Sequence, residues 1–272
     1  MNLHTAWVSY GENNEYQGYV AYPKRAKATL PAIIIIQEIW GVDEHIEAVT
    51  ERFAMAGYVA FAPDLYARDG QREEKLTRER VGLIKAFMES LPPSAWHDEK
   101  AREDALASLP EDIQQQVRGT FARLFGGLPM QDYVVQLTHT SEFLREEYAI
   151  TKGQGVASLG FCMGGALSAL LACHDDKLKG AAIFYGRTPA DDLLPKIQCP
   201  VIGFYGENDP AITDGVEAFG KKMKDLGKNF DAQIYKGAGH AFFNDTRSSY
   251  HIESARDAFV QSLSFMQDVL AY

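Results

Sequence analysis

The sequence predicts an α/β fold in which helices flank a mostly parallel β-sheet, and three observations support this prediction. The segment 32–36 is apolar at every position, which is typical of a strand buried on both faces of a parallel sheet. From residue 155 onward, strand-like and helix-like segments alternate along the chain. The length of 272 residues allows one large domain or two small ones. Because no segment resembles a flexible linker, we expect a single domain over residues 1–272.

The first elements are a hairpin, a buried strand, a helix and a second strand. Residues 6–10 and 16–22 are rich in aromatic residues and valine and flank a turn-like Gly-Glu-Asn-Asn sequence, which predicts an antiparallel hairpin at the sheet edge. Residues 44–56 carry apolar side chains at helical spacing and end before Gly57, a typical C-terminal cap residue. Residues 58–63 are strand-like again. The later elements are expected as strands at 155–161, 180–185, 201–205 and 230–235, and as helices at 131–148, 164–174, 214–226 and 252–270.

One stretch, residues 64–153, interrupts this alternation because it contains no convincing strand. Residues 71–91 have a charged helical pattern that stops at two prolines. Further on, Ser108 and Glu111 have the spacing of a helix capping box. We therefore expect residues 69–130 to form a helical insertion. It would either cover the functional site as a lid or pack away from it, as a helical pair or a dimer contact.

Composition and charge exclude several classes of protein. Lys and Arg total 27 while Asp and Glu total 37, and the resulting formal charge of −10 argues against a nucleic-acid surface. No apolar run reaches the roughly 18 residues that suggest a transmembrane helix. The first residues lack the basic and then apolar pattern of a signal peptide. Three cysteines without C-x-x-C spacing fit neither a disulfide scaffold nor a zinc site, so we expect a cytoplasmic protein with free thiols.

The strongest functional signal lies where a predicted strand ends and a helix begins. The residues Gly160-Phe161-Cys162-Met163-Gly164-Gly165 match the nucleophile-elbow pattern G-x-S-x-G, with Cys in place of Ser. A tight turn lifts the nucleophile above the sheet, so the residues two before and two after it must be small. The N–H groups and dipole of the following helix stabilise a thiolate there. A buried structural cysteine is the alternative; it suits Cys173 and Cys199, whereas the strand–turn–helix context favours a nucleophile for Cys162.

A nucleophilic cysteine needs a base, and the base needs an acid that orients it. In folds with this motif the nucleophile, the acid and the histidine follow in that order along the chain. Glu207 and Asp209 both follow the strand 201–205, and we favour Asp209 because it directly precedes Pro210, after the turn. His240 is the expected base because it lies in a glycine-rich loop after the next strand.

The sequence predicts neither a metal nor a cofactor. The other six histidines have no partners at metal-ligand spacing; they are His4, His45, His97, His139, His174 and His251. The elbow is the one glycine-rich motif. It lacks the Lys-Ser/Thr of a phosphate loop and the spaced glycines of a dinucleotide fingerprint.

These motifs resemble the dienelactone hydrolase family, a branch of the α/β-hydrolases that uses a Cys–His–Asp triad. The resemblance covers most of the chain outside residues 69–130. It includes Gln37-Glu38-Ile39-Trp40-Gly41 after the first buried strand and Pro63-Asp64-Leu65-Tyr66-Ala67-Arg68 after the next. It implies an α/β-hydrolase fold and the hydrolysis of small esters or lactones through a cysteine acyl-enzyme, without a cofactor.

The resemblance also implies the roles of the catalytic residues. Cys162 would be the nucleophile, His240 the base and Asp209 the acid that orients it. Glu38 matches a glutamate that contacts the resting thiol and helps to set its ionisation. The oxyanion hole would be formed by the backbone N–H groups of Ile39 and Met163.

The substrate-binding residues match the family less completely. Arg68 matches one of two arginines that hold a substrate carboxylate, and Trp40 and Tyr185 match aromatic residues that line the cleft. Ala241 stands where the dienelactone-cleaving members have Ser, and Asn244 stands where they have the second arginine. Dienelactone itself is therefore not the expected substrate, and two residues remain as candidates to replace the missing arginine, Arg187 and Arg247.

The first functional hypothesis is an esterase or lactonase that acts on a small ester, lactone or thioester, and Arg68 predicts a modest preference for substrates that carry a carboxylate. The alternatives are a thioesterase, a promiscuous hydrolase of other electrophilic esters, and a non-catalytic binding protein that has kept the fold. We expect the partner to be a small-molecule substrate, with no nucleic acid and no membrane involved, and the chain to be a monomer or a homodimer.

Overall fold

The computed structural model describes residues 2–96 and 98–271, with the backbone alone described at residues 93 and 94. His97 therefore lies outside the described residues. Within them, no helix combines the length and the apolar character that crossing a membrane requires.

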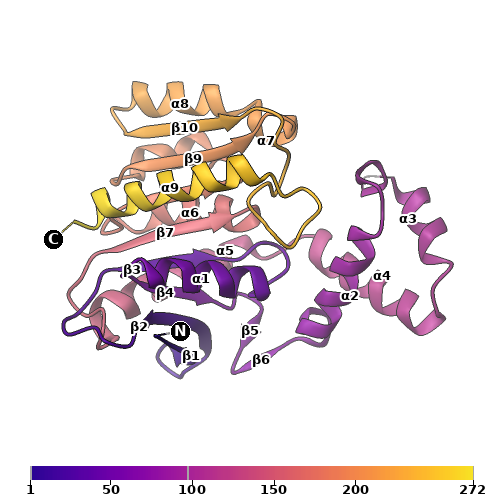
Figure 1. Ribbon diagram of the computed structural model, residues 1–272, viewed down its shortest axis with the longest axis horizontal. Coiled ribbons are helices and arrows are strands. Elements are labelled where there is room, and N and C mark those ends of the chain that lie inside the picture. The colour runs from indigo at the N-terminus through magenta and orange to yellow at the C-terminus, as the bar shows by residue number, and fades with distance from the viewer. Residues whose placement is uncertain (1, 97, 272) are drawn as a thin grey trace.

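An eight-stranded sheet in the order β1-β2-β4-β3-β7-β8-β9-β10 forms the centre of the molecule (Figure 1). The hairpin of β1 and β2 is antiparallel and pairs antiparallel with β4, and all later neighbours are parallel. This confirms the predicted α/β class with an antiparallel hairpin at one edge. The strands are β1 Leu3–Tyr10, β2 Tyr16–Pro23, β3 Ala32–Ile36, β4 Val59–Pro63, β7 Val156–Phe161, β8 Ala181–Phe184, β9 Val201–Gly206 and β10 Phe230–Tyr235.

Helices cover both faces of the sheet because side chains alternate along each strand. Ile33 and Ile35 of β3 belong to one apolar cluster together with α1 and α9. Ile34 and Ile36 point the other way and join a second cluster with α5, α6 and α8. Figure 1 shows α1 and α9 in front of the sheet. These helices are α1 Glu44–Met55, α5 Met130–Glu142, α6 Met163–His174, α8 Val216–Asp225 and α9 Ile252–Val269, with the short helical segments η3 Phe143–Glu147, η4 Asp191–Lys196 and α7 Pro210–Thr213 between them.

Residues 69–130 hold a group of helices that projects beyond the ends of β7 and β9, where the functional loops gather (Figure 1). Apolar residues of these helices, such as Val81 and Ile84, belong to the same apolar cluster as α5 and α6. The elements are η1 Glu74–Leu76, α2 Arg78–Glu89, η2 Pro93–Trp96, α3 Glu99–Leu106 and α4 Glu111–Phe125.

Three sequence-based expectations about this region need correction. A short hairpin, β5 Ala67–Arg68 with β6 Gln71–Arg72, lies where no strand was expected. The helix predicted from residue 71 begins only at Arg78, because the Thr77 side chain accepts the N–H of Arg80 and caps it. The capping box is wrong as well: Ser108 donates its hydroxyl to the carbonyl of Ala105 at the end of α3, and Pro110 precedes α4 without a side-chain cap.

Candidate active site

Cys162 lies on a sharp turn between β7 and α6. Its backbone has φ +54° and ψ −114°, a conformation that L-residues rarely adopt and that is typical of strained functional positions. The N–H of Cys162 donates to the carbonyl of Phe184 on the neighbouring strand at 3.0 Å, which anchors the turn to the sheet. The side chain is partly exposed, whereas Cys173 and Cys199 are buried.

The glycines around Cys162 are required by close backbone contacts. A Cβ atom at Gly160 would lie 1.9 Å from the carbonyl oxygen of Gly164. A Cβ atom at Gly164 would lie 2.3 Å from the carbonyl oxygen of Ile36. Strand β7, helix α6 and strand β3 therefore approach each other more closely than any other residue type allows, and this is the physical content of the elbow motif.

The loops after β9 and β10 bring an acid and a histidine together beside the elbow. Asp209 Oδ2 lies 2.6 Å from His240 Nδ1, and the side chain of Cys162 also forms a hydrogen bond with His240. Since Asp209 occupies Nδ1, the nitrogen that faces Cys162 is Nε2. Glu207, the competing acid, accepts the N–H of Gly237 instead. The arrangement is therefore Cys162, His240 and Asp209, the same three residues that the motif spacing predicted.

The surroundings of His240 favour its charged form. Burial lowers its pKa, but the charge of Cys162 and the hydrogen bonds to Asp209 and Cys162 outweigh burial and hold the pKa well above its usual value. The side chain of His240 is still 42% exposed, so it contacts solvent as well as Cys162.

The oxyanion hole formed by the N–H groups of Ile39 and Met163 stays a prediction, and two features of the backbone support it. Met163 is the first residue of α6, and N–H groups in the first turn of a helix have no partner within the helix. The carbonyl of Glu38 accepts the N–H of Gly41 at 3.2 Å. Because Glu38 C=O and Ile39 N–H belong to the same peptide plane, this turn directs the Ile39 N–H the opposite way. Tyr66 fixes the next peptide by donating its hydroxyl to the carbonyl of Ile39 at 2.8 Å.

Glu38 is buried, with 2% of its surface exposed, and the structure gives both of its carboxylate oxygens a neutral donor. The hydroxyl of Tyr185 donates to Oε1 at 3.1 Å, and the side-chain amide of Asn244 donates to Oε2 at 2.7 Å. The sequence implied a contact between Glu38 and the resting thiol. The hydrogen bonds described for the Glu38 side chain are those with Tyr185 and Asn244, and its contact with the resting thiol stays a prediction.

The two aromatic residues expected to line the cleft are buried. Tyr185 has 0% exposure and φ +40°, and its ring lies 5.2 Å from the ring of His240. Burial, followed by the charge of Glu38, raises the pKa of Tyr185 well above its usual value, so its hydroxyl stays protonated and donates. Trp40 is 3% exposed and meets Trp96 of the insertion edge to face, with 6.5 Å between ring centroids. Both residues pack against other aromatic rings, and their contact with a substrate stays a prediction.

The three candidate arginines differ in exposure and in partners. Arg68 is exposed, and its guanidinium lies 4.6 Å from the ring centroid of Tyr16 in the edge hairpin, while its role toward a substrate carboxylate stays a prediction. Arg187 is also exposed. Arg247 is largely buried over the rings of Trp40 and Trp96, at 5.4 and 4.6 Å, and pairs with Glu89 of α2.

Asn244 is the residue whose importance sequence reasoning missed. The sequence showed it as the position where an arginine was absent, yet its side chain is fully buried and holds Glu38. The available signal was that the polar Asn244 directly follows the apolar residues Ala241, Phe242 and Phe243. Within residues 2–96 and 98–271, no three His, Cys, Asp or Glu side chains are grouped so that they could bind a metal ion.

Comparisons with known proteins agree with this geometry. A family model described as "Dienelactone hydrolase family" matches residues 16–270. A protein of Saccharolobus solfataricus named "Putative carboxymethylenebutenolidase" is 32% identical over 261 residues, which are 93% of this chain and 94% of that protein. A protein of Escherichia coli K12 with the same name is 28% identical over 277 residues, covering 97% of this chain and 85% of that one.

Solved structures also match over the whole chain. The crystal structure titled "Putative Dienelactone Hydrolase" from Klebsiella pneumoniae has a TM-score of 0.73 and 27% identity, with 99% of both chains covered. A dienelactone hydrolase-like promiscuous phosphotriesterase from metagenomic libraries has a TM-score of 0.68 and covers 100% of both chains. At 16% identity, this second likeness shows the fold alone.

Proposed function

Because the chain belongs to the dienelactone hydrolase family, whose members are hydrolases, we propose that it cleaves small carboxylic esters or lactones through a cysteine acyl-enzyme. The observation that carries this proposal is the strained Cys162 beside a charged His240 that Asp209 orients at 2.6 Å. The names of the curated relatives support a lactone or ester as the substrate class.

In this proposal the reaction has two stages, acylation of Cys162 and hydrolysis of the thioester. The thiolate of Cys162 attacks the carbonyl carbon, a C–S bond forms, and the N–H groups of Ile39 and Met163 receive the developing oxyanion. The tetrahedral intermediate collapses as the C–O bond breaks, and the imidazolium of His240 gives its proton to the leaving alkoxide. Neutral His240 then takes a proton from water, which attacks the thioester and releases the acid and the thiolate.

The charge of the preferred substrate is not set by Arg68 in this proposal. Its contact with Tyr16 supports a role in holding the edge hairpin. Arg247 lies closer to the reaction centre, since its charge acts on Tyr185, but Glu89 already neutralises it. We therefore propose a small neutral ester or lactone as the substrate class.

The helical insertion acts as a lid in this proposal. Trp96 of η2 contacts Trp40, which directly follows the oxyanion residue Ile39. Glu89 of α2 binds Arg247 in the loop that follows His240. These two contacts support a cover over the site and disfavour a helical pair packed away from it.

Turnover of a chromogenic aryl acetate by the wild type tests the proposal directly. Replacement of the nucleophile, Cys162→Ala, should abolish turnover, and Cys173→Ala is the matched control that should retain it. A panel with an aryl ester, a five-membered lactone and an acyl thioester separates an esterase or lactonase from a thioesterase. No turnover of any panel member by the wild type would refute a hydrolase and favour a binding protein.

A further inference from the structure

Helix α2 presents one charged face to the loops of the site. Arg78, Lys85 and Glu89 are spaced by seven and four residues, which places them on the same side of the helix. Arg78 donates to the carbonyl of Val42 at 2.8 Å and pairs with Glu47, so the first turn of α2 binds the loop after β3.

The last turn of α2 binds a different loop. Glu89 pairs with Arg247, and it accepts the backbone N–H and the hydroxyl of Ser248 at 3.1 and 3.0 Å. These hydrogen bonds and the charge of Arg247 outweigh burial and lower the pKa of Glu89, so the carboxylate is charged. The loop that follows His240 is therefore fixed to the insertion.

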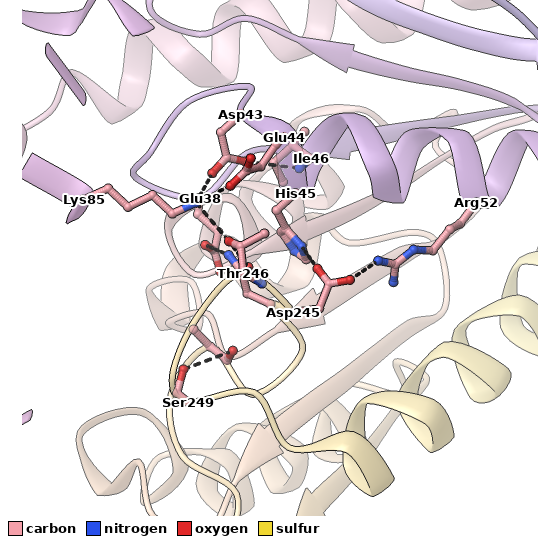
Figure 2. Close-up of polar contacts among 12 residues, drawn as sticks. Glu38, Asp43, Glu44, His45, Ile46, Arg52, Lys85, Asp245, Thr246 and Ser249 are labelled. Atoms are coloured by element: carbon pink, nitrogen blue, oxygen red, sulfur yellow. Dashed lines mark hydrogen bonds and ion pairs between the residues drawn. The ribbon is translucent and has the colours of Figure 1, made fainter. Parts of the chain in front are cut away.

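Lys85 lies between these two attachments and joins both loops. Its Nζ is 2.8 Å from Asp43 Oδ2 and 2.9 Å from Thr246 Oγ1, and Figure 2 shows it between these two side chains. The Lys85 side chain is 14% exposed and that of Asp43 19%, so water screens this ion pair less than one on the open surface. Asp43 also caps α1 by accepting the N–H of Ile46.

The contact continues from Thr246 to the buried carboxylate. The hydroxyl and the N–H of Thr246 both donate to Asn244 Oδ1, at 2.7 and 3.0 Å. These two donors fix the orientation of the Asn244 amide, whose nitrogen then faces Glu38 at 2.7 Å. Because an ammonium can only donate, Thr246 accepts from Lys85 and keeps its own hydrogen for Asn244. In the series Lys85, Thr246, Asn244 and Glu38, each residue thus donates a hydrogen bond to the next one.

We propose that Lys85 is a positioning residue of the hydrolytic site, acting from the insertion through Thr246 and Asn244. It ties the loop that carries Ile39 to the loop that carries His240, so that the oxyanion donor and the base keep their places relative to Cys162. This inference rests on the proposed hydrolase function. Helix α2 then has a second role besides covering the cleft, because the contacts of Lys85 hold the reacting groups in position.

The test compares Lys85→Met with Arg80→Met as the matched control. Arg80 lies on the same helix with a similar exposure of 17%, but its partners are Glu74 and Thr120 within the insertion. For hydrolysis of an aryl acetate, Lys85→Met should lower kcat by roughly 5- to 20-fold with little change in KM, because misplaced reacting groups slow the chemical step. Arg80→Met should change kcat by less than about twofold, with a comparable change in unfolding temperature.

A double-mutant cycle shows whether Lys85 acts through Thr246. Thr246→Val keeps the shape of the side chain and removes its hydroxyl, so it should lower kcat to a similar extent. The double variant should be no slower than the slower single variant, because both changes break the same series of hydrogen bonds. Additive losses, an equal loss in Arg80→Met, or an unchanged kcat in Lys85→Met would each overturn the inference. The wild type and Cys162→Ala, measured in parallel, report on the hydrolase function independently of these outcomes.

Discussion

The three cysteines of the chain have distinct chemical environments. Burial raises the pKa of Cys173 to about 11 and that of Cys199 to about 12. At neutral pH only about one Cys173 side chain in ten thousand is then a thiolate. Cys162 is partly exposed at a helix N-terminus and pairs with a charged histidine. Of the three cysteines, the proposed nucleophile is therefore the most accessible.

Alkylation should distinguish the three thiols. At pH 7 we expect iodoacetamide to modify Cys162 roughly 100-fold faster than Cys173 or Cys199, because the thiolate is the reacting form. Peptide mapping by mass spectrometry measures the three rates. Unfolding in guanidinium chloride is the control and should bring the rates together. Equal rates in the folded protein would contradict the elbow geometry.

The two acidic residues after β9 should differ in their effect on catalysis. Asp209→Asn should lower kcat by roughly 10²- to 10⁴-fold, because the amide no longer orients and stabilises the imidazolium. Glu207→Gln should change kcat by less than about threefold, since Glu207 contacts the N–H of Gly237 and not His240. Steady-state kinetics on an aryl ester provides the comparison, and a larger loss in Glu207→Gln would show that the acid is wrongly assigned.

The pKa of His240 offers an independent measurement of the same contact. Since the hydrogen bond and the charge of Asp209 both raise this pKa, Asp209→Asn should lower it. An NMR titration of the ring carbon protons follows the midpoint, which should move to lower pH in the variant. A midpoint that stays in place would mean that Cys162 alone holds the charge.

At the scale of elements, the elbow depends on how closely its backbones approach. Gly160→Ala should destabilise the protein by about 3 kcal/mol or more, because a Cβ atom 1.9 Å from a backbone oxygen forces β7 and α6 apart. Gly82→Ala is the control: Gly82 lies inside α2, and a Cβ there would meet nothing within 4 Å. This second change should stabilise the protein by about 0.5–1 kcal/mol. Chemical denaturation measures both, and a Gly160→Ala protein of wild-type stability would refute the packing argument.

The elements that the sequence predicted well are those in which local pattern and burial agree. The apolar run 32–36 became β3, and the elbow motif placed the junction of β7 and α6 within one residue. The start of α2 was missed and Ser108 was wrongly assigned as the cap of α4, because a hydroxyl side chain can bind backbone groups on either side of it and the local sequence does not say which. The face of α2 that binds the site was also beyond prediction. Its charged residues resemble a solvated surface until the loops that they bind are known.

At the scale of the whole molecule, the net charge of −10 should influence which substrates arrive. The field of such a protein repels anions, and salt screens that repulsion. We expect kcat/KM for a carboxylate-bearing aryl ester to rise about two- to threefold between roughly 20 and 200 mM salt. The value for a neutral ester should stay within about 1.5-fold. A fall for the anionic ester would indicate that a local arginine attracts it.

The candidate site was predictable to the extent that its residues lie in motifs. The spacing of Cys162, Asp209 and His240 pointed to the contacts that the structure contains. Arg68 was assigned by a local sequence match, which did not show that its guanidinium lies over Tyr16. The pairing of Asn244 with Glu38 joins residues 206 positions apart, and no local pattern records such a contact.

All three tryptophans of the chain lie at the junction between the insertion and the rest of the molecule. The guanidinium of Arg247 is enclosed by Trp40 and Trp96, and the guanidinium of Arg78 lies 5.7 Å from the ring centroid of Trp7. Indole emission responds to the polarity and charge of its surroundings, so the intrinsic fluorescence of this protein should respond to the position of the insertion. Opening of the helices during turnover would therefore be visible in stopped-flow experiments without any attached dye.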